Sequence, residues 1–81
     1  MQSSQTTAEK AIRLHLAARK KNQAWLADQL GESAFWVGRR MSGAVAFDLT
    51  DLDRIARVFS VTLDELLAAA DAVKVPEAVG A

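Results

Sequence analysis

Residues 22–43 read NQAWLADQLGESAFWVGRRMSG, a segment that predicts two short helices joined by a tight turn. Asn22 and Ser33 are residue types that accept hydrogen bonds from the first free N–H groups of a helix, so each is expected to begin one. Gly31 lies between them, where a left-handed conformation can end the first helix and reverse the chain. Ala27 is small enough for the two helices to approach closely. The segment therefore predicts two helices packed at an angle.

The second of these helices is expected to run from Ser33 to about Ser42, and Gly43 closes it. Val37 and Met41 lie four residues apart and form its buried stripe. The positions off that stripe are Ala34, Phe35, Trp36, Gly38, Arg39 and Arg40. Aromatic rings and arginines on the outward part of a short helix are costly in solubility unless something binds there. We therefore expect the function to lie on this surface.

Three further helices are expected, at residues 7–20, 49–59 and 63–73. Their capping boxes are Thr6 with Glu9, Asp48 with Asp51, and Thr62 with Glu65, and Phe47 with Leu52 adds a hydrophobic staple. Helical spacing places on their inward faces Ala8, Ile12, His15 or Leu16, Arg19, Leu49, Leu52, Ile55, Ala56, Phe59, Leu63, Leu66 and Leu67. The sequence thus predicts an all-α domain of five helices at residues 7–74. A flexible N-terminus (1–6) precedes it, and Val75 and Pro76 begin a frayed tail (75–81).

The composition fits one small helical domain without metal or disulfide chemistry. The 81 residues are 51% hydrophobic, with one proline and no cysteine, so disulfides and thiolate metal sites are excluded. No secretory signal is visible, and no apolar run approaches the ~18 residues that a membrane span needs. The expected location is the cytoplasm, with no membrane partner.

The formal net charge is zero, but the charges are unevenly distributed. Residues 1–43 contain seven Lys or Arg and three acids, whereas residues 44–81 contain three Lys or Arg and seven acids. A polyanion would be attracted to the first half and repelled by the second. An imbalance of this size also arises by chance on solvated surfaces, so it supports a nucleic-acid partner only together with the outward arginines.

Three blocks carry a family resemblance: NQAWLADQLG, SAFWVGRRMSG and FDLTDLDRIARVFSVTLDELL. In this order and spacing the chain resembles the lambdoid phage repressor and Cro class, the XRE-type helix-turn-helix family, from about Ile12 to Leu67. The resemblance implies a compact lambda-repressor-like fold whose second short helix enters the major groove of DNA. It implies neither enzymatic activity nor a cofactor. His15, Lys21, Arg40 and Ser60 depart from the family pattern, and Ser60 stands where glycine is usual.

The resemblance also implies roles for individual residues. Its base-reading positions are Ser33, Ala34, Phe35 and Arg39. Arg39 is expected to bind guanine, and Ala34 and Phe35 to contact thymine methyl groups. The expected phosphate contacts are Lys20, Lys21, Asn22, Gln23, Trp36, Arg40 and Ser42. Alternatively, Phe35 could be partly buried against the preceding helix. Trp36 could instead cover part of the core.

Other conspicuous residues have structural interpretations. His15 has no second ligand at metal spacing and is expected at the edge of the core. Trp25 is expected to pack on the aliphatic stem of Lys21. The acids Asp48, Asp51 and Asp53 are explained as cap and helix-dipole partners. No catalytic pair or metal site is predicted.

The sequence hypothesis is therefore a transcriptional regulator of the phage Cro or immunity-repressor kind, which binds operator DNA in the cytoplasm of a bacterial host. A homodimer on DNA is expected, with Leu67, Ala70, Val73 and Val75 as candidate contacts that could equally close the core. No small-molecule ligand is expected. The alternatives are an antitoxin, an excision-type accessory factor, and a protein-interaction module that has lost DNA binding.

Overall fold

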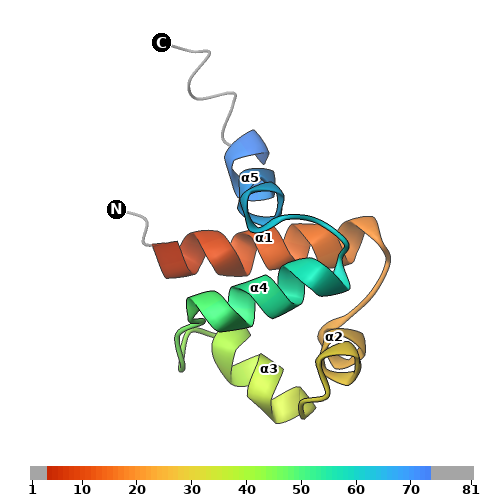
Figure 1. Cartoon of the computed structure of the whole chain (residues 1–81). Helices are drawn as coiled ribbons and strands as arrows, with labels where there is room; N and C mark the ends of the chain where they lie inside the picture. The colour runs from red at the N-terminus through yellow and green to blue at the C-terminus, as the bar shows by residue number, and fades with distance from the viewer. Residues whose placement is uncertain (1–3, 74–81) are drawn as a thin grey trace.

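The computed structural model describes residues 4–73, which form five α-helices and no strand (Figure 1). The helices are α1 (Ser4–Ala18), α2 (Gln23–Leu30), α3 (Ala34–Met41), α4 (Leu49–Val58) and α5 (Leu63–Val73). The predicted all-α, five-helix fold is confirmed. Within the described range, no helix is long and apolar enough to cross a bilayer. The tail predicted at residues 75–81, and its start at Val75 and Pro76, lie outside the described residues.

The arrangement leaves α2 and α3 together at one end of the molecule. In Figure 1, α1 and α4 cross the middle, α5 lies on one side of them, and the α2–α3 pair lies on the other. α1 packs against α5, while α2 packs against α3 and α4. The predicted functional segment is thus supported from behind by α4 rather than enclosed by the other helices.

α1 begins and ends earlier than the sequence predicts. It starts at Ser4, so Thr6 lies within the helix and the predicted capping box of Thr6 with Glu9 is wrong. It ends at Ala18, and Lys20 takes a left-handed conformation (φ 56°) that closes the helix. Glycine usually fills this position because its missing Cβ removes the steric penalty. Lys20 therefore lies beyond the helix end rather than in its last turn.

The starts of α4 and α5 agree with the sequence. Asp48 accepts from the Asp51 N–H at 2.7 Å and donates its own N–H to the Asp51 carboxylate at 3.2 Å. Thr62 and Glu65 form the same reciprocal pair. The predicted burial of Leu49 is wrong: it is 72% exposed, because this first residue of α4 points away from the core.

The core draws one fully buried side chain or more from every helix. These side chains are Ile12 of α1, Leu26 of α2, Val37 and Met41 of α3, Ile55 of α4 and Leu66 of α5. Burying each contributes about 1.5–3 kcal/mol, and no short helix here would be stable without it. The two short helices α2 and α3 are thereby fixed to the longer ones.

Much of the apolar side of α5 is buried in this core. Leu66 and Ala70 are fully buried, and Leu63 and Leu67 pack partly against the core cluster. The side chain of Val73 and all of Val75 lie outside what the structure describes. A dimer contact through this side of the molecule stays a prediction.

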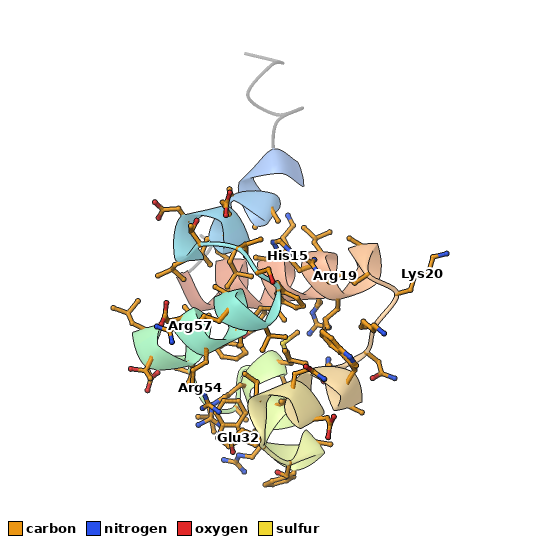
Figure 2. The ribbon with its side chains drawn as sticks, turned by 45° about the vertical axis from the view of Figure 1, so that its right-hand side comes forward. His15, Arg19, Lys20, Glu32, Arg54 and Arg57 are labelled. Carbon is orange, nitrogen blue, oxygen red and sulfur yellow. The ribbon has the colours of Figure 1, made fainter. Side chains whose placement is uncertain are left out.

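Three arginines fix helix C-termini. Arg54 donates to the Leu30 carbonyl at the end of α2 at 2.7 Å and to the Glu32 carboxylate at 3.2 Å (Figure 2). The other two bonds run from Arg13 to the Met41 carbonyl, at the end of α3, and from Arg19 to the Phe59 carbonyl, after α4. Helix C-terminal carbonyls lack partners within the helix, so each bond satisfies one of them. These arginines belong to the framework.

Aromatic stacking joins α1, α2 and the end of α4. The Phe59 ring stacks on His15 with centroids 5.2 Å apart and on Trp25 at 6.2 Å. Lys21 places its ammonium 5.4 Å from the Trp25 ring centre, so the two side chains lie together as predicted, and the contact shown is that of the charged group. His15 Nδ1 faces an Arg19 guanidinium nitrogen at 3.0 Å, and its Nε2 is buried without a partner among the described residues. His15 is thus part of the packing, as predicted for the core edge.

Candidate nucleic-acid interface

The turn between α2 and α3 has the geometry that the sequence predicts. Asn22 accepts from the Trp25 N–H at 2.8 Å and Ser33 from the Trp36 N–H at 3.0 Å, so both N-caps are confirmed. Gly31 adopts the left-handed conformation (φ 72°) and ends α2. Ala27 is 3% exposed, which fits its predicted place on the inner side of α2. The caps and the turn together fix where the first turn of α3 begins.

α3 has one buried side and one side open to solvent. Val37 and Met41 are each 1% exposed, and the predicted buried stripe is confirmed. Phe35 is 72% exposed, and Arg39 is exposed one helical turn further along. The alternative that Phe35 is partly buried against α2 is therefore wrong. An apolar ring and a guanidinium lie together on the outer face of α3.

Arg39 has a free guanidinium edge. Its guanidinium carbon lies 5.4 Å from the centre of the Phe35 ring. Among the described residues, none accepts a hydrogen bond from its side chain. The N–H groups of a guanidinium form a planar fork that suits two neighbouring acceptors. Arg39 can thus bind a bidentate acceptor without breaking an existing bond.

Arg40, the next residue, is held inside the domain. It lies 3.8 Å from the centre of the Trp36 ring and 3.4 Å from the Asp51 carboxylate. The side chains of Arg40 and Asp51 are 18% and 11% exposed. Trp36 is half-buried and packs against the core cluster. It therefore covers part of the core, which was the alternative to a contact with the DNA backbone. Arg40 already has an acidic partner, and its predicted phosphate contact is not needed to explain its position.

The other predicted contacts lie around the starts of α2 and α3. Lys20 and Lys21 are exposed before α2, and Lys20 extends away from the body of the molecule (Figure 2). Gln23 is half-exposed at the first position of α2, where free helix N–H groups favour an anion. Ser33 and Ala34 are exposed at the start of α3, and Ser42 is exposed at its end, where its hydroxyl donates to the Arg39 carbonyl.

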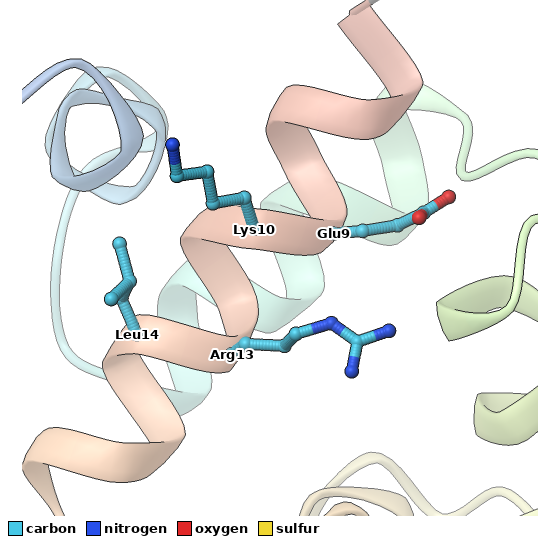
Figure 3. A pocket seen from close by; sticks show the side chains of 4 residues that line it. All are labelled: Glu9, Lys10, Arg13 and Leu14. Atoms are coloured by element: carbon cyan, nitrogen blue, oxygen red, sulfur yellow. The ribbon is translucent and has the colours of Figure 1, made fainter. Parts of the chain in front are cut away.

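A hollow on α1 contains none of the predicted contact residues. Its volume is about 330 Å³, and it is lined by Glu9, Lys10, Arg13 and Leu14 (Figure 3). Glu9 and Arg13 point to one side of α1, while Lys10 and Leu14 point to the other. Arg13 already donates to the end of α3, so this hollow offers one engaged cation and no cluster of converging groups.

Two short helices joined by a glycine turn, with the outer face of the second left open, define a helix-turn-helix domain. The chain belongs to the BetR domain family, a helix-turn-helix-like family that matches residues 5–80. No curated protein and no solved structure matches it. The family is consistent with DNA binding in regulation. The narrower Cro or repressor class remains a prediction.

Sequence reasoning missed the residues that hold the site from behind. Arg54 spans 24 positions to reach Leu30, and Asp51 is 11 positions from Arg40. Asp51 was predicted as a cap partner, and it has that role as well. The only signal for its second role was the arginine at position 40, where an apolar or aromatic residue is common in the resembled family.

Proposed function

We propose that this domain is a sequence-specific double-stranded DNA-binding regulator whose α3 enters the major groove. One observation carries the proposal: the outer face of α3 exposes Phe35 and Arg39, whose guanidinium has no hydrogen-bond acceptor among the described residues, while Val37 and Met41 on the inner face are buried. A helix that is packed on one side and exposes an apolar ring and a free guanidinium on the other suits the major groove, which is about 12 Å wide.

The contacts divide into two groups. Ser33, Ala34, Phe35 and Arg39 would face base edges. Phosphates would be bound by Lys20, Lys21, Asn22, Gln23, Trp36 and Ser42. Arg40 keeps its place in this second group only if it leaves Asp51. We assign it instead the task of fixing α3 against α4.

The narrower role that we propose is that of a phage Cro or immunity repressor, acting in the cytoplasm of a bacterial host. Such a protein works by occupying an operator and blocking polymerase, so it needs binding and no catalysis. One domain of this size makes few base contacts, and two copies on adjacent half-sites would supply useful affinity.

The test is a fluorescence-anisotropy titration of the full chain with a labelled duplex from the promoter region of its own gene. A random duplex of equal length is the control. We expect tighter binding to the promoter duplex. Absence of any complex with either duplex at 50 mM salt would contradict the proposal.

The salt dependence of the same titration reports the number of copies bound. Lys20 and Lys21 are the two cations among the proposed phosphate contacts that no acidic group holds among the described residues. One copy should lose ~12-fold in affinity between 50 and 200 mM salt, because log K falls by ~0.9 per neutralised phosphate for each unit of log salt. Two copies should lose ~150-fold.

Three variants locate the interface. Arg39→Ala should bind the promoter duplex and random DNA about equally, because it removes a base contact. Lys20→Ala should weaken both duplexes by the same factor. Arg57→Ala, which removes the same charge from the exposed surface of α4, is the matched control and should leave both affinities unchanged.

A protein-interaction module is the second candidate, favoured by the 72% exposure of Phe35. An exposed aromatic ring suits a protein partner as well as a thymine methyl group. In that case Phe35→Ala would abolish the partner interaction, and neither duplex would bind at low salt. The titration above therefore separates the two functions.

A further inference from the structure

The Phe35–Arg39 pair differs from every other arginine–aromatic contact of the described residues in being open on its outer side. Arg19 also lies over a ring, that of Phe59, but its guanidinium donates to two carbonyl oxygens. Arg40 has a carboxylate, and Arg54 a carbonyl and a carboxylate. Arg39 alone in this group has a ring beneath it and no acceptor in front of it.

The stacked pair behaves as one unit on the helix surface. Its residues are four positions apart, so they lie one above the other on the same face. An exposed cation–π contact is weak, but it biases the Arg39 rotamer toward the ring. The ring therefore favours one direction of the guanidinium fork and presents its own apolar surface directly beside it.

Each half of the pair matches a different group in the major groove. The fork matches guanine O6 and N7, the two adjacent acceptors of one base. The ring has no donor, and the apolar group that the major groove offers is the methyl group on C5 of thymine. 5-Methylcytosine carries a methyl group at the same ring position. The 5.4 Å between guanidinium carbon and ring centre is compatible with two neighbouring base pairs, which are stacked 3.4 Å apart along the axis.

We propose that Phe35 and Arg39 together read a guanine directly beside a pyrimidine that carries a C5-methyl group, either thymine or 5-methylcytosine. This inference rests on the proposed DNA-binding function and specifies its ligand. The domain would then distinguish methylated from unmethylated cytosine next to guanine, and thymine from uracil.

The first stage of the test identifies the bases. A pool of random duplexes is selected by the full chain, and the enriched duplex is remade with single replacements. Each thymine is replaced by uracil, which removes the methyl group, and each guanine by 7-deazaguanine, which removes N7. We expect a sensitive thymine and a sensitive guanine at neighbouring base pairs. Sensitive positions that are not neighbours would overturn the inference.

The second stage assigns each base to a side chain. Loss of one buried methyl group, about 0.8 kcal/mol, corresponds to a fourfold weaker complex. That fourfold loss should disappear in Phe35→Ala, and the loss from 7-deazaguanine should disappear in Arg39→Ala. Leu49→Ala removes an equally exposed side chain on α4 and should retain both losses. Methyl sensitivity that persists in Phe35→Ala would overturn the inference.

The third stage tests methylated cytosine. With 5-methylcytosine paired to guanine at the sensitive thymine position, binding should be about fourfold tighter than with cytosine, for the same methyl group. Equal binding would contradict the inference, whereas the proposed function would stand as long as one sequence is enriched. If no duplex is enriched and none binds at 50 mM salt, the proposed function fails and this inference fails with it.

Discussion

The outer face of α3 and the contact region between α3 and α4 each contain an arginine stacked on an aromatic ring, yet their surroundings differ. On the outer face, Arg39 lies 5.4 Å from the Phe35 ring centre in an exposed position. Between the helices, Arg40 lies 3.8 Å from Trp36 and faces a carboxylate. The same local pattern, repeated one residue apart, thus yields a free binding group and a structural one. The difference comes from α4, which places the Asp51 carboxylate opposite Arg40 and no such group opposite Arg39 among the described residues.

The largest effect should come from the buried side that supports both regions. Met41→Ala removes a side chain that is 1% exposed, and it should lower the free energy of unfolding by about 3 kcal/mol through lost burial and a cavity. Urea denaturation followed by circular dichroism measures this change. Phe35→Ala, on the outer face of the same helix, should stay within about 0.5 kcal/mol of the parent. Equal losses in both variants would remove the distinction between the two sides of α3.

The next effect separates the two arginines directly. Arg40→Ala leaves Asp51, whose side chain is 11% exposed, without its cationic partner. We expect a loss of about 2 kcal/mol in unfolding free energy, because a buried carboxylate that loses its partner is costly. Thermal and urea denaturation at constant pH measure the loss.

Arg39→Ala is the matched control for Arg40→Ala, since it removes the same atoms one position earlier. Its unfolding free energy should equal that of the parent, and its preference for the promoter duplex should be lost. If Arg40→Ala instead changed DNA affinity without a change in stability, our assignment of the two arginines would have to be exchanged.

Whether a contact could be predicted from the sequence depends on how far apart its two residues lie along the chain. The caps at Asn22, Ser33, Asp48 and Thr62 were predicted because each acts within three residues of its own position. The partner of Arg40 comes from another helix, and helical periodicity carries no information about it. Leu49 has the right spacing for burial but occupies the first position of α4, where the chain has not yet turned toward the core. The face of α3 was predictable, whereas its support by Arg54 and Asp51 was not.

A smaller effect tests the start of α3. Ser33→Ala removes the acceptor of the Trp36 N–H and should cost about 1 kcal/mol of stability. Ser33→Asp keeps an acceptor there and should preserve stability, but it places a negative charge at the proposed interface. Its affinity for both duplexes should therefore fall, as measured by anisotropy. Unchanged DNA binding by Ser33→Asp would place the start of α3 outside the interface.

The smallest effect compares two residues with the same strained backbone in different regions. Lys20 and Ser60 both have positive φ, 56° and 60°, at the ends of α1 and α4. Glycine removes the steric penalty of this conformation but adds entropy to the unfolded chain. We therefore expect Lys20→Gly and Ser60→Gly each to raise the unfolding free energy by about 0.5 kcal/mol, measured by the urea midpoint.

The two glycine variants should differ in DNA affinity. Lys20→Gly also deletes an exposed cation beside α2, so its affinity for promoter and random duplexes should fall by a common factor. Ser60→Gly changes no charge and lies after α4, away from α3, so its affinity should match that of the parent. If only the variant at position 20 gains stability and loses DNA affinity, the strained backbone there is offset by the contribution of Lys20 to DNA binding. Equal DNA affinity in both variants would instead make Lys20 a helix terminator with no part in binding.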